Sequence, residues 1–172
     1  MTKIIVAQLP TDVKKILFVC TANICRSAAA AGILKMMLLE NSEDIEVSSA
    51  GTHALPGKST TSFMLHTLKQ SGLNIEAHRS RQLTPAMVNQ ADVIFVMELA
   101  HRLFIVTKIP ESKSKVFLLS DFHPTSIMVP AETNIPDPIG MNDFFYENVN
   151  EMIHLSCRNI ANQLKEVCPE KI

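Results

Sequence analysis

The chain has 172 residues, of which 47% are hydrophobic and 19% charged, and its formal net charge is −1. This length and composition fit one globular domain with a substantial core and exclude a disordered protein. The charge balance lacks the basic excess that drives nonspecific nucleic-acid binding, and no apolar run reaches the roughly 18 to 20 residues that span a bilayer.

The first part of the chain predicts a strand followed by a helix. Residues 1–13 are interpreted as an N-terminal extension, and residues 14–172 as a single domain. The continuous apolar run over 14–20 is typical of a strand buried on both faces. From Ser27 to about Leu39, alanines and an apolar stripe predict a helix with Ser27 as its N-cap.

Strands and helices continue to alternate through the rest of the chain. The patterns predict strands over 45–51, 91–98 and 115–122 and helices over 60–72, 83–90, 99–108 and 142–167. Such alternation indicates a parallel sheet with helices on both faces, which binds ligands beyond the carboxyl ends of its strands. A proline-rich loop of about fifteen residues follows the fourth strand and has a length typical of functional lids.

Four cysteines stand at positions 20, 25, 157 and 168. They form neither the dense framework of a small secreted domain nor a zinc cluster, and no histidine lies at ligand spacing from another histidine or a cysteine. We therefore expect reduced thiols in a cytoplasmic protein that uses no metal and no other cofactor.

The stretch CTANICRS lies between the first predicted strand and helix, with Cys20 six residues before Arg26. A loop entering a helix directs backbone N–H groups and the positive helix end toward one point, which suits a phosphate-sized anion. Arg26 can donate two parallel hydrogen bonds to phosphate oxygens. The same surroundings favour the thiolate of Cys20 and so a nucleophile, with the Ser27 hydroxyl as a donor to it in competition with capping the helix. The alternative is a buried cysteine and a surface arginine that share no function.

Asp137 lies between two prolines in IPDPIG. The prolines restrict the backbone and hold the carboxylate in a narrow range of directions. Phosphoryl transfer to a thiolate needs an acid for the leaving oxygen, and Asp137 is our candidate. A simple turn aspartate is the alternative.

Four motifs, CTANICRS, SSAGTHALPG, HRSRQLT and DPIG, resemble in this order the low-molecular-weight protein tyrosine phosphatases. The resemblance runs from about Lys14 to the C-terminus. It implies a four-stranded parallel sheet flanked by helices on both faces, with a phosphate-binding loop between the first strand and first helix. It also implies a metal-free, two-step reaction in which Cys20 attacks phosphorus. Asp137 protonates the leaving phenolate and then activates water.

The resemblance also assigns the residues around the nucleophile. The phosphate-binding loop would comprise Thr21, Ala22, Asn23, Ile24, Cys25 and Arg26. A supporting hydrogen-bond network would comprise Asn23, Ser27, Ser49 and His78. Cys25 matches a position that can form a reversible disulfide with the nucleophile, while a small packing residue is the alternative for it.

Three positions depart from the family pattern. Ala22 replaces a usual glycine, which would cost about 1 kcal/mol if that position needed a positive φ. Ala28 replaces a usual proline, and Ile139 follows the DP dipeptide where many members carry tyrosine. The walls of the site that would enclose a phosphotyrosine ring are therefore aliphatic, which indicates weak selectivity for an aromatic ring. The missing tyrosine also indicates a bacterial type.

Other functions share this pattern. A protein arginine phosphatase tends to carry threonine where Ile24 stands, and a bulky Ile24 favours an aryl phosphate. An arsenate reductase needs relay cysteines, but Cys157 and Cys168 would lie about 16 Å apart along one helix. A module that binds phosphotyrosine without turnover is the third alternative. The expected partner is a phosphotyrosine-containing protein, and SAGTHALPG is similar to bacterial members that stand beside tyrosine kinases of polysaccharide export.

Overall fold

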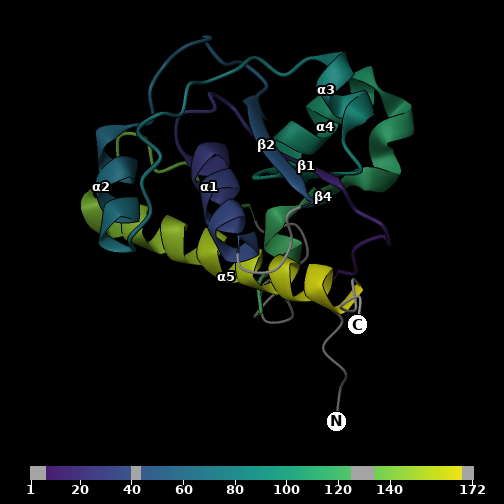
Figure 1. The fold of residues 1–172 in the computed structure, drawn as a ribbon. Coiled ribbons are helices and arrows are strands. Elements are labelled where there is room, and N and C mark those ends of the chain that lie inside the picture. The colour runs from purple at the N-terminus through teal and green to yellow at the C-terminus, as the bar shows by residue number, and fades with distance from the viewer. Residues whose placement is uncertain (1–6, 40–43, 125–133, 168–172) are drawn as a thin grey trace.

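The centre of the molecule is one parallel sheet of four strands (Figure 1). The computed structural model describes residues 7–39, 44–124 and 134–167. The strand order is β2-β1-β3-β4, with β1 at Lys15–Cys20, β2 at Glu46–Gly51, β3 at Val93–Val96 and β4 at Val116–Leu118. The predicted four-stranded parallel sheet is confirmed.

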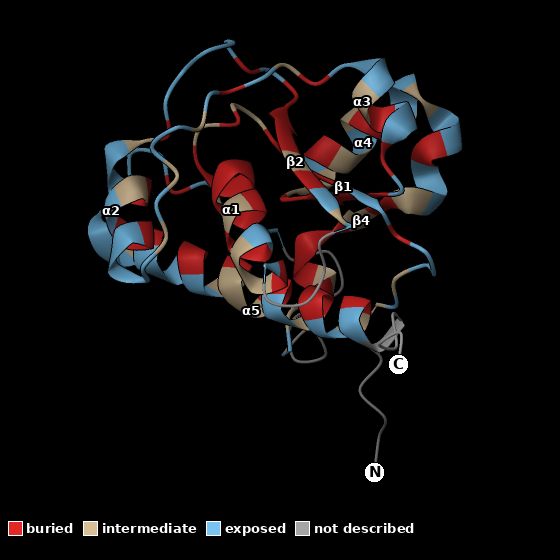
Figure 2. Cartoon of the chain, in the orientation of Figure 1, coloured by how far each residue is buried: buried red, intermediate tan, exposed pale blue. Residues whose placement is uncertain are grey.

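Helices cover both faces of this sheet, as predicted (Figure 1). One face packs on α1 (Arg26–Leu38) and α5 (Asp143–Val167), and α2 (Ser62–Gln70) lies against α5. The other face packs on α3 (Pro85–Gln90) and α4 (Leu99–Lys108). Two 3₁₀ segments, η1 (Pro110–Lys115) and η2 (Leu119–Phe122), flank β4. Figure 2 shows that the strands and the inward faces of the helices carry most of the buried residues.

Local sequence signals explain where several helices begin and end. The Thr61 and Thr84 side chains accept hydrogen bonds from Met64 N–H and Met87 N–H, which satisfies free donors in the first turns of α2 and α3. Pro85 occupies the first position of α3, where its missing N–H costs no hydrogen bond. Gly72 follows α2 with φ +78°, a left-handed conformation that glycine adopts without strain.

Two predicted boundaries are wrong. Ser27 is not an N-cap: α1 begins at Arg26, Cys25 is its N-cap, and no side chain caps the helix. The fourth strand ends at Leu118 rather than at residue 122, because Leu119 and Phe122 turn inward as η2 and are fully buried. Residues 125–133 of the predicted lid, and Cys168, lie outside the described residues.

Residues 7–13 lie against the body of the fold. Leu9 N–H donates to Gln163 Oε1 at 3.0 Å, and Gln163 Nε2 donates to the Ala7 carbonyl at 2.9 Å. Val13 is buried in the cluster beneath α5. Within the described ranges, no helix combines the length and apolarity that crossing a membrane requires.

Candidate active site

The anion-binding loop, residues 20–26, lies at a reversal point of the sheet. Cys20 ends β1 and Arg26 begins α1. β1 has β2 on one side and β3 on the other, so the chain leaves β1 where neighbouring connections run to opposite faces. Ligands of doubly wound sheets bind at this point, beyond the carboxyl ends of the strands.

Four carbonyl groups of the loop point away from its centre. They accept hydrogen bonds from neighbouring segments: Thr52 N–H to Cys20, His53 N–H to Thr21, His78 Nε2–H to Asn23, and Thr61 N–H to Ile24. A peptide group that turns its oxygen outward presents its N–H to the opposite side. Since no side chain caps α1, the loop and the first turn of the helix offer a set of donors to an anion.

The Cys20 thiol lies inside this loop. Its Sγ atom is 2.9 Å from Ser27 Oγ and accepts a hydrogen bond from Asn23 N–H at 3.3 Å. Ser27 Oγ accepts from Asn23 Nδ2 at 2.9 Å, and its own hydrogen has two acceptors within reach, the sulfur at 2.9 Å and the Ala50 carbonyl at 3.4 Å. The Asn23 N–H and the Ser27 hydroxyl therefore both face the sulfur.

Asn23 fixes the shape of the loop. It is fully buried and has φ +56°, a left-handed conformation in which asparagine is enriched. Its amide donates to Ser27 Oγ and to Ser49 Oγ, both at 2.9 Å, and its Oδ1 accepts from Arg81 N–H at 2.9 Å. The predicted network of Asn23, Ser27, Ser49 and His78 is thus brought together around the loop. Ala22 has no positive φ, so the replacement of glycine there carries no backbone strain.

Arg26 is buried, with 1% of its surface exposed, and contacts two carboxylates. Nη1 donates to Glu98 Oε1 and to the Ile135 carbonyl, and Nη2 donates to Asp137 Oδ2 at 2.8 Å. Asp137 Oδ1 also accepts from Ile139 N–H at 3.1 Å. The structure therefore places Asp137 at the mouth of the loop beside Arg26. A small pocket here is lined by Cys20, Ala22, Ile24, Cys25, Arg26, Asp137 and Ile139.

Two histidines support the loop from outside. His101 Nδ1 accepts from Glu98 N–H, so Nε2 of the neutral ring donates to Thr21 Oγ1 at 2.9 Å. Burial lowers the pKa of His101 to about 4, which keeps this ring neutral. Burial also lowers the pKa of His78, whose Nε2–H bonds the Asn23 carbonyl at 2.7 Å.

Cys25 differs from Cys20 in its surroundings. Burial, followed by the nearby Cys20 and Asp137, raises the pKa of Cys25 to about 12. The side chain is free and almost wholly buried, so Cys25 is held as a neutral thiol. A disulfide between Cys25 and Cys20 stays a prediction.

The sequence analysis missed Glu98, His101 and Gly51. A Cβ on Gly51 would lie 2.5 Å from the Thr21 carbonyl oxygen, so only glycine lets β2 approach the loop. Glu98 comes just after β3, and its position beyond a buried strand was the available signal. Among the described residues, no group of three or more His, Cys, Asp or Glu is arranged to hold a metal ion.

The fold and the loop define a doubly wound α/β protein in which a loop with a cysteine at one end and a buried arginine at the other lies beyond the carboxyl ends of the strands. A family model described as low molecular weight phosphotyrosine protein phosphatase matches residues 15–169. The chain therefore belongs to the low molecular weight phosphotyrosine protein phosphatase family, and it is an enzyme of the phosphatase class. The expected family, fold class and enzyme class are confirmed.

The chain resembles both relatives named as arginine phosphatases and relatives named as tyrosine phosphatases. It is 32% identical over 151 residues to a protein-arginine-phosphatase of Geobacillus stearothermophilus, covering 88% of this chain and 96% of the relative. It is 33% identical over 141 residues to the probable low molecular weight protein-tyrosine-phosphatase EpsP of Ralstonia solanacearum, covering 82% and 89%. The crystal structure of the tyrosine phosphatase Wzb from Escherichia coli K30 with sulphate superposes with a TM-score of 0.77 at 28% identity, covering 88% and 99%.

Proposed function

We propose that the protein is a tyrosine phosphatase that hydrolyses aryl phosphomonoesters through a cysteinyl-phosphate on Cys20. The observation that carries this proposal is the position of Cys20 Sγ, with hydrogen-bond donors from Ser27 and Asn23 and with the Arg26 guanidinium beside the same loop. A thiolate so placed meets a bound phosphate from the side opposite the leaving oxygen.

The first step forms the S–P bond and breaks the P–O ester bond. The outward-facing loop carbonyls support this step, because they leave N–H groups for the equatorial phosphate oxygens, where negative charge gathers. Asp137 gives its proton to the leaving phenolate. In the second step Asp137 takes a proton from water, the water oxygen attacks phosphorus, and the S–P bond breaks to restore the thiolate.

Arg26 connects phosphate binding with the acid. With no phosphate bound, its Nη2 donates to Asp137 Oδ2. A phosphate dianion in the loop competes for the same donor. Arg26 remains held by Glu98 and the Ile135 carbonyl, so the contact that gives way is the one to Asp137, which frees this carboxyl to carry the proton.

A second candidate is a protein arginine phosphatase, which the relative from Geobacillus stearothermophilus favours by its name. The apolar mouth formed by Ala22, Ile24 and Ile139 supports an aryl group over a guanidinium group. The half-buried Ile24 offers no hydrogen-bond acceptor to a phosphorylated guanidinium. We therefore favour phosphotyrosine as the substrate.

The proposed partner is a phosphotyrosine-containing protein, with a bacterial tyrosine kinase as the specific candidate. Relatives named EpsP and Wzb support the assignment to a tyrosine phosphatase. The free thiols of Cys20, Cys25 and Cys157 support a reducing compartment, and we propose that the protein acts in the cytoplasm.

The mechanism is tested with para-nitrophenyl phosphate at pH 5 to 8 in the absence of metal. Cys20→Ser should abolish turnover, and Asp137→Ala should lower kcat by about 10² to 10⁴-fold. Cys157→Ser is the matched control, because this cysteine is also buried but lies on α5 and donates to the Ala30 carbonyl, outside the loop. Turnover by Cys20→Ser at the rate of the wild type would overturn the assignment of the nucleophile.

The substrate is tested with phosphotyrosine and phosphoarginine peptides of the same sequence. We expect a higher kcat/KM for phosphotyrosine, and Ile24→Thr should shift the ratio toward phosphoarginine. A wild-type preference for phosphoarginine would replace the aryl assignment with the second candidate. Binding of phosphotyrosine without hydrolysis would favour a binding module.

A further inference from the structure

A second cavity, which we call the basic pocket, opens behind the anion-binding loop. Its walls come from α1, β2 and the segment of residues 75–81, and its volume is about 520 Å³. The floor exists because α1 presents the small residues Ala28, Ala31 and Gly32 toward β2. Pockets of roughly 300 to 1,000 Å³ accommodate small molecules.

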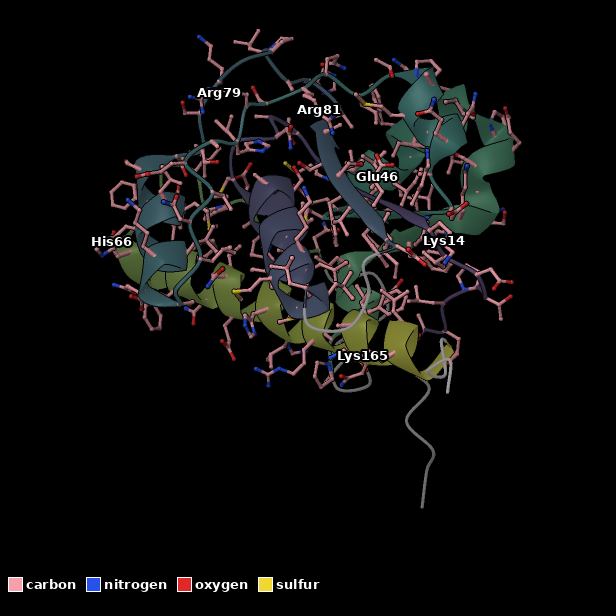
Figure 3. All side chains as sticks on the ribbon, in the orientation of Figure 1. Lys14, Glu46, His66, Arg79, Arg81 and Lys165 are labelled. Atoms are coloured by element: carbon pink, nitrogen blue, oxygen red, sulfur yellow. The ribbon has the colours of Figure 1, made fainter. Side chains whose placement is uncertain are left out.

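The basic pocket carries an excess of positive charge. Lys35, Arg79 and Arg81 line it together with one carboxylate, Glu46. Glu46 pairs with Lys15 at 3.7 Å, whereas in the part of the chain that the structure describes none of the three lining cations has a carboxylate oxygen within 4.0 Å. In Figure 3, Arg79 and Arg81 lie on the segment that crosses above α1 and β2.

Both arginines are held in place by backbone carbonyl groups. Arg79 Nη1 donates to the carbonyls of Glu76 and His78, and Arg81 Nε and Nη2 donate to the Ser49 carbonyl. These bonds occupy only part of the five N–H donors of each guanidinium. Fixed guanidinium groups with spare donors suit phosphate oxygens, because little side-chain freedom is lost on binding.

The charges converge on His78, which also lines the pocket. After burial, the charges of Arg81, Lys35 and Arg79 contribute to lowering the pKa of this imidazole. Three cations from two segments of the chain thus act on one wall of the cavity. A ligand that brings negative charge relieves their repulsion.

Three wall residues of the basic pocket hold Asn23, the central residue of the anion-binding loop. His78 Nε2–H bonds its carbonyl at 2.7 Å, Ser49 Oγ accepts from its amide, and Arg81 N–H donates to its Oδ1. Asn23 N–H in turn donates to Cys20 Sγ. A change at the pocket wall therefore reaches the thiol through one buried residue.

We propose that the basic pocket binds a small phosphorylated anion and that this ligand adjusts the anion-binding loop from behind. Lys35, Arg79 and Arg81 bind its phosphate oxygens, and Ser48 and Ser49 of β2 line the wall beside it. The effect on turnover rests on the proposed function, whereas the binding does not.

Binding is tested by titrating inorganic pyrophosphate into ¹⁵N-labelled protein and following amide chemical shifts. Pyrophosphate in the anion-binding loop shifts residues 20–26, whereas pyrophosphate in the basic pocket also shifts residues 35, 48 and 79–81. The shifts of residues 35, 48 and 79 therefore give the dissociation constant of the second site even where the loop responds to both. The double variant Lys35→Ala/Arg79→Ala should weaken the second constant at least about tenfold and leave the first unchanged.

The matched control is Lys113→Ala/Arg158→Ala, which removes the same two charges from exposed positions on η1 and α5. It should keep both constants within about twofold of the wild type. Shifts confined to residues 20–26 would overturn the proposed site. So would an equal weakening of the second dissociation constant in both double variants.

Regulation is tested by the effect of pyrophosphate on hydrolysis of para-nitrophenyl phosphate. Occupation of the basic pocket should change kcat, and this change should vanish in Lys35→Ala/Arg79→Ala. Pure competition with substrate in both proteins would refute the coupling. Because the amide shifts need no turnover, a protein without phosphatase activity would still report whether the basic pocket binds its ligand.

Discussion

Replacement of Asn23 tests how the fold holds the anion-binding loop. The side chain is fully buried and makes three hydrogen bonds of 2.9 Å, to Ser27, to Ser49 and from Arg81 N–H. Its φ of +56° adds a backbone requirement that alanine meets poorly. Asn23→Ala therefore removes the network and strains the loop at once.

The expected loss of stability follows from these contacts. Each buried hydrogen bond contributes about 1 kcal/mol, so the three together contribute about 3 kcal/mol. Alanine in the left-handed conformation adds about 1 kcal/mol. We expect Asn23→Ala to lower the free energy of unfolding by about 3–4 kcal/mol. Asn23→Gly, which tolerates the backbone, should lose about 1 kcal/mol less.

The assay is guanidinium chloride unfolding together with kcat for para-nitrophenyl phosphate at fixed pH. Asn150→Ala is the matched control, since Asn150 is a buried asparagine whose Oδ1 lacks a hydrogen-bond partner among the described residues. It should change kcat little. An Asn23→Gly variant with the unfolding midpoint and the kcat of the wild type would refute the reasoning, because the hydrogen bonds of Asn23 would then contribute neither to stability nor to turnover.

Two further predictions concern the surroundings of the loop. Gly51→Ala should cost about 1–3 kcal/mol and most of the activity, because its Cβ would meet the Thr21 carbonyl oxygen at 2.5 Å. Gly32→Ala should keep activity, because the Ile75 methyl group that its Cβ would meet at 2.8 Å lies outside the anion-binding loop; equal activities of the two variants would contradict this. His101 has a pKa of about 4 in the fold against 6.5 when unfolded, so the unfolded chain binds the additional proton and stability should fall as pH decreases from about 6.5 to about 4. At 1.36 kcal/mol per pKa unit, the shift sets an upper limit of about 3 kcal/mol, and we expect a loss of about 2 kcal/mol in the free energy of unfolding. A His101→Gln variant should lack that part of the pH dependence in unfolding titrations.

Much of the fold was predictable because its signals are local. Buried strands appear as short apolar runs, and Thr84 with Pro85 marks the beginning of α3 whatever surrounds it. The anion-binding loop was predictable for the same reason, since Cys20 and Arg26 lie within one strand–loop–helix unit. The fourth strand was predicted too long because tertiary packing, not the apolar pattern, decides that Leu119 and Phe122 turn inward.

The sequence could not place residues that meet only through the order of the strands. Glu98 reaches Arg26 because β3 lies next to β1, and that neighbourhood is a property of the sheet rather than of either segment. His101 reaches Thr21, just after β1, for the same reason. Ser27 was predicted as an N-cap because serine is common at that position, but its hydroxyl lies 2.9 Å from the Cys20 sulfur and does not cap the helix.

The two carboxylates on Arg26 differ in a way that bears on the proposed mechanism. Glu98 has 29% of its side chain exposed and Asp137 has 43%, while the arginine side chain is almost fully buried at 2%. A phosphate that enters the loop gives Arg26 a new partner, so the guanidinium stays paired when one carboxylate leaves. Because Asp137 is the more exposed of the two carboxylates, it loses less on separating from Arg26, and we expect the phosphate to displace Asp137 rather than Glu98. The sequence neighbours of Asp137, two prolines, then keep it within reach of the leaving oxygen instead of letting it swing into solvent.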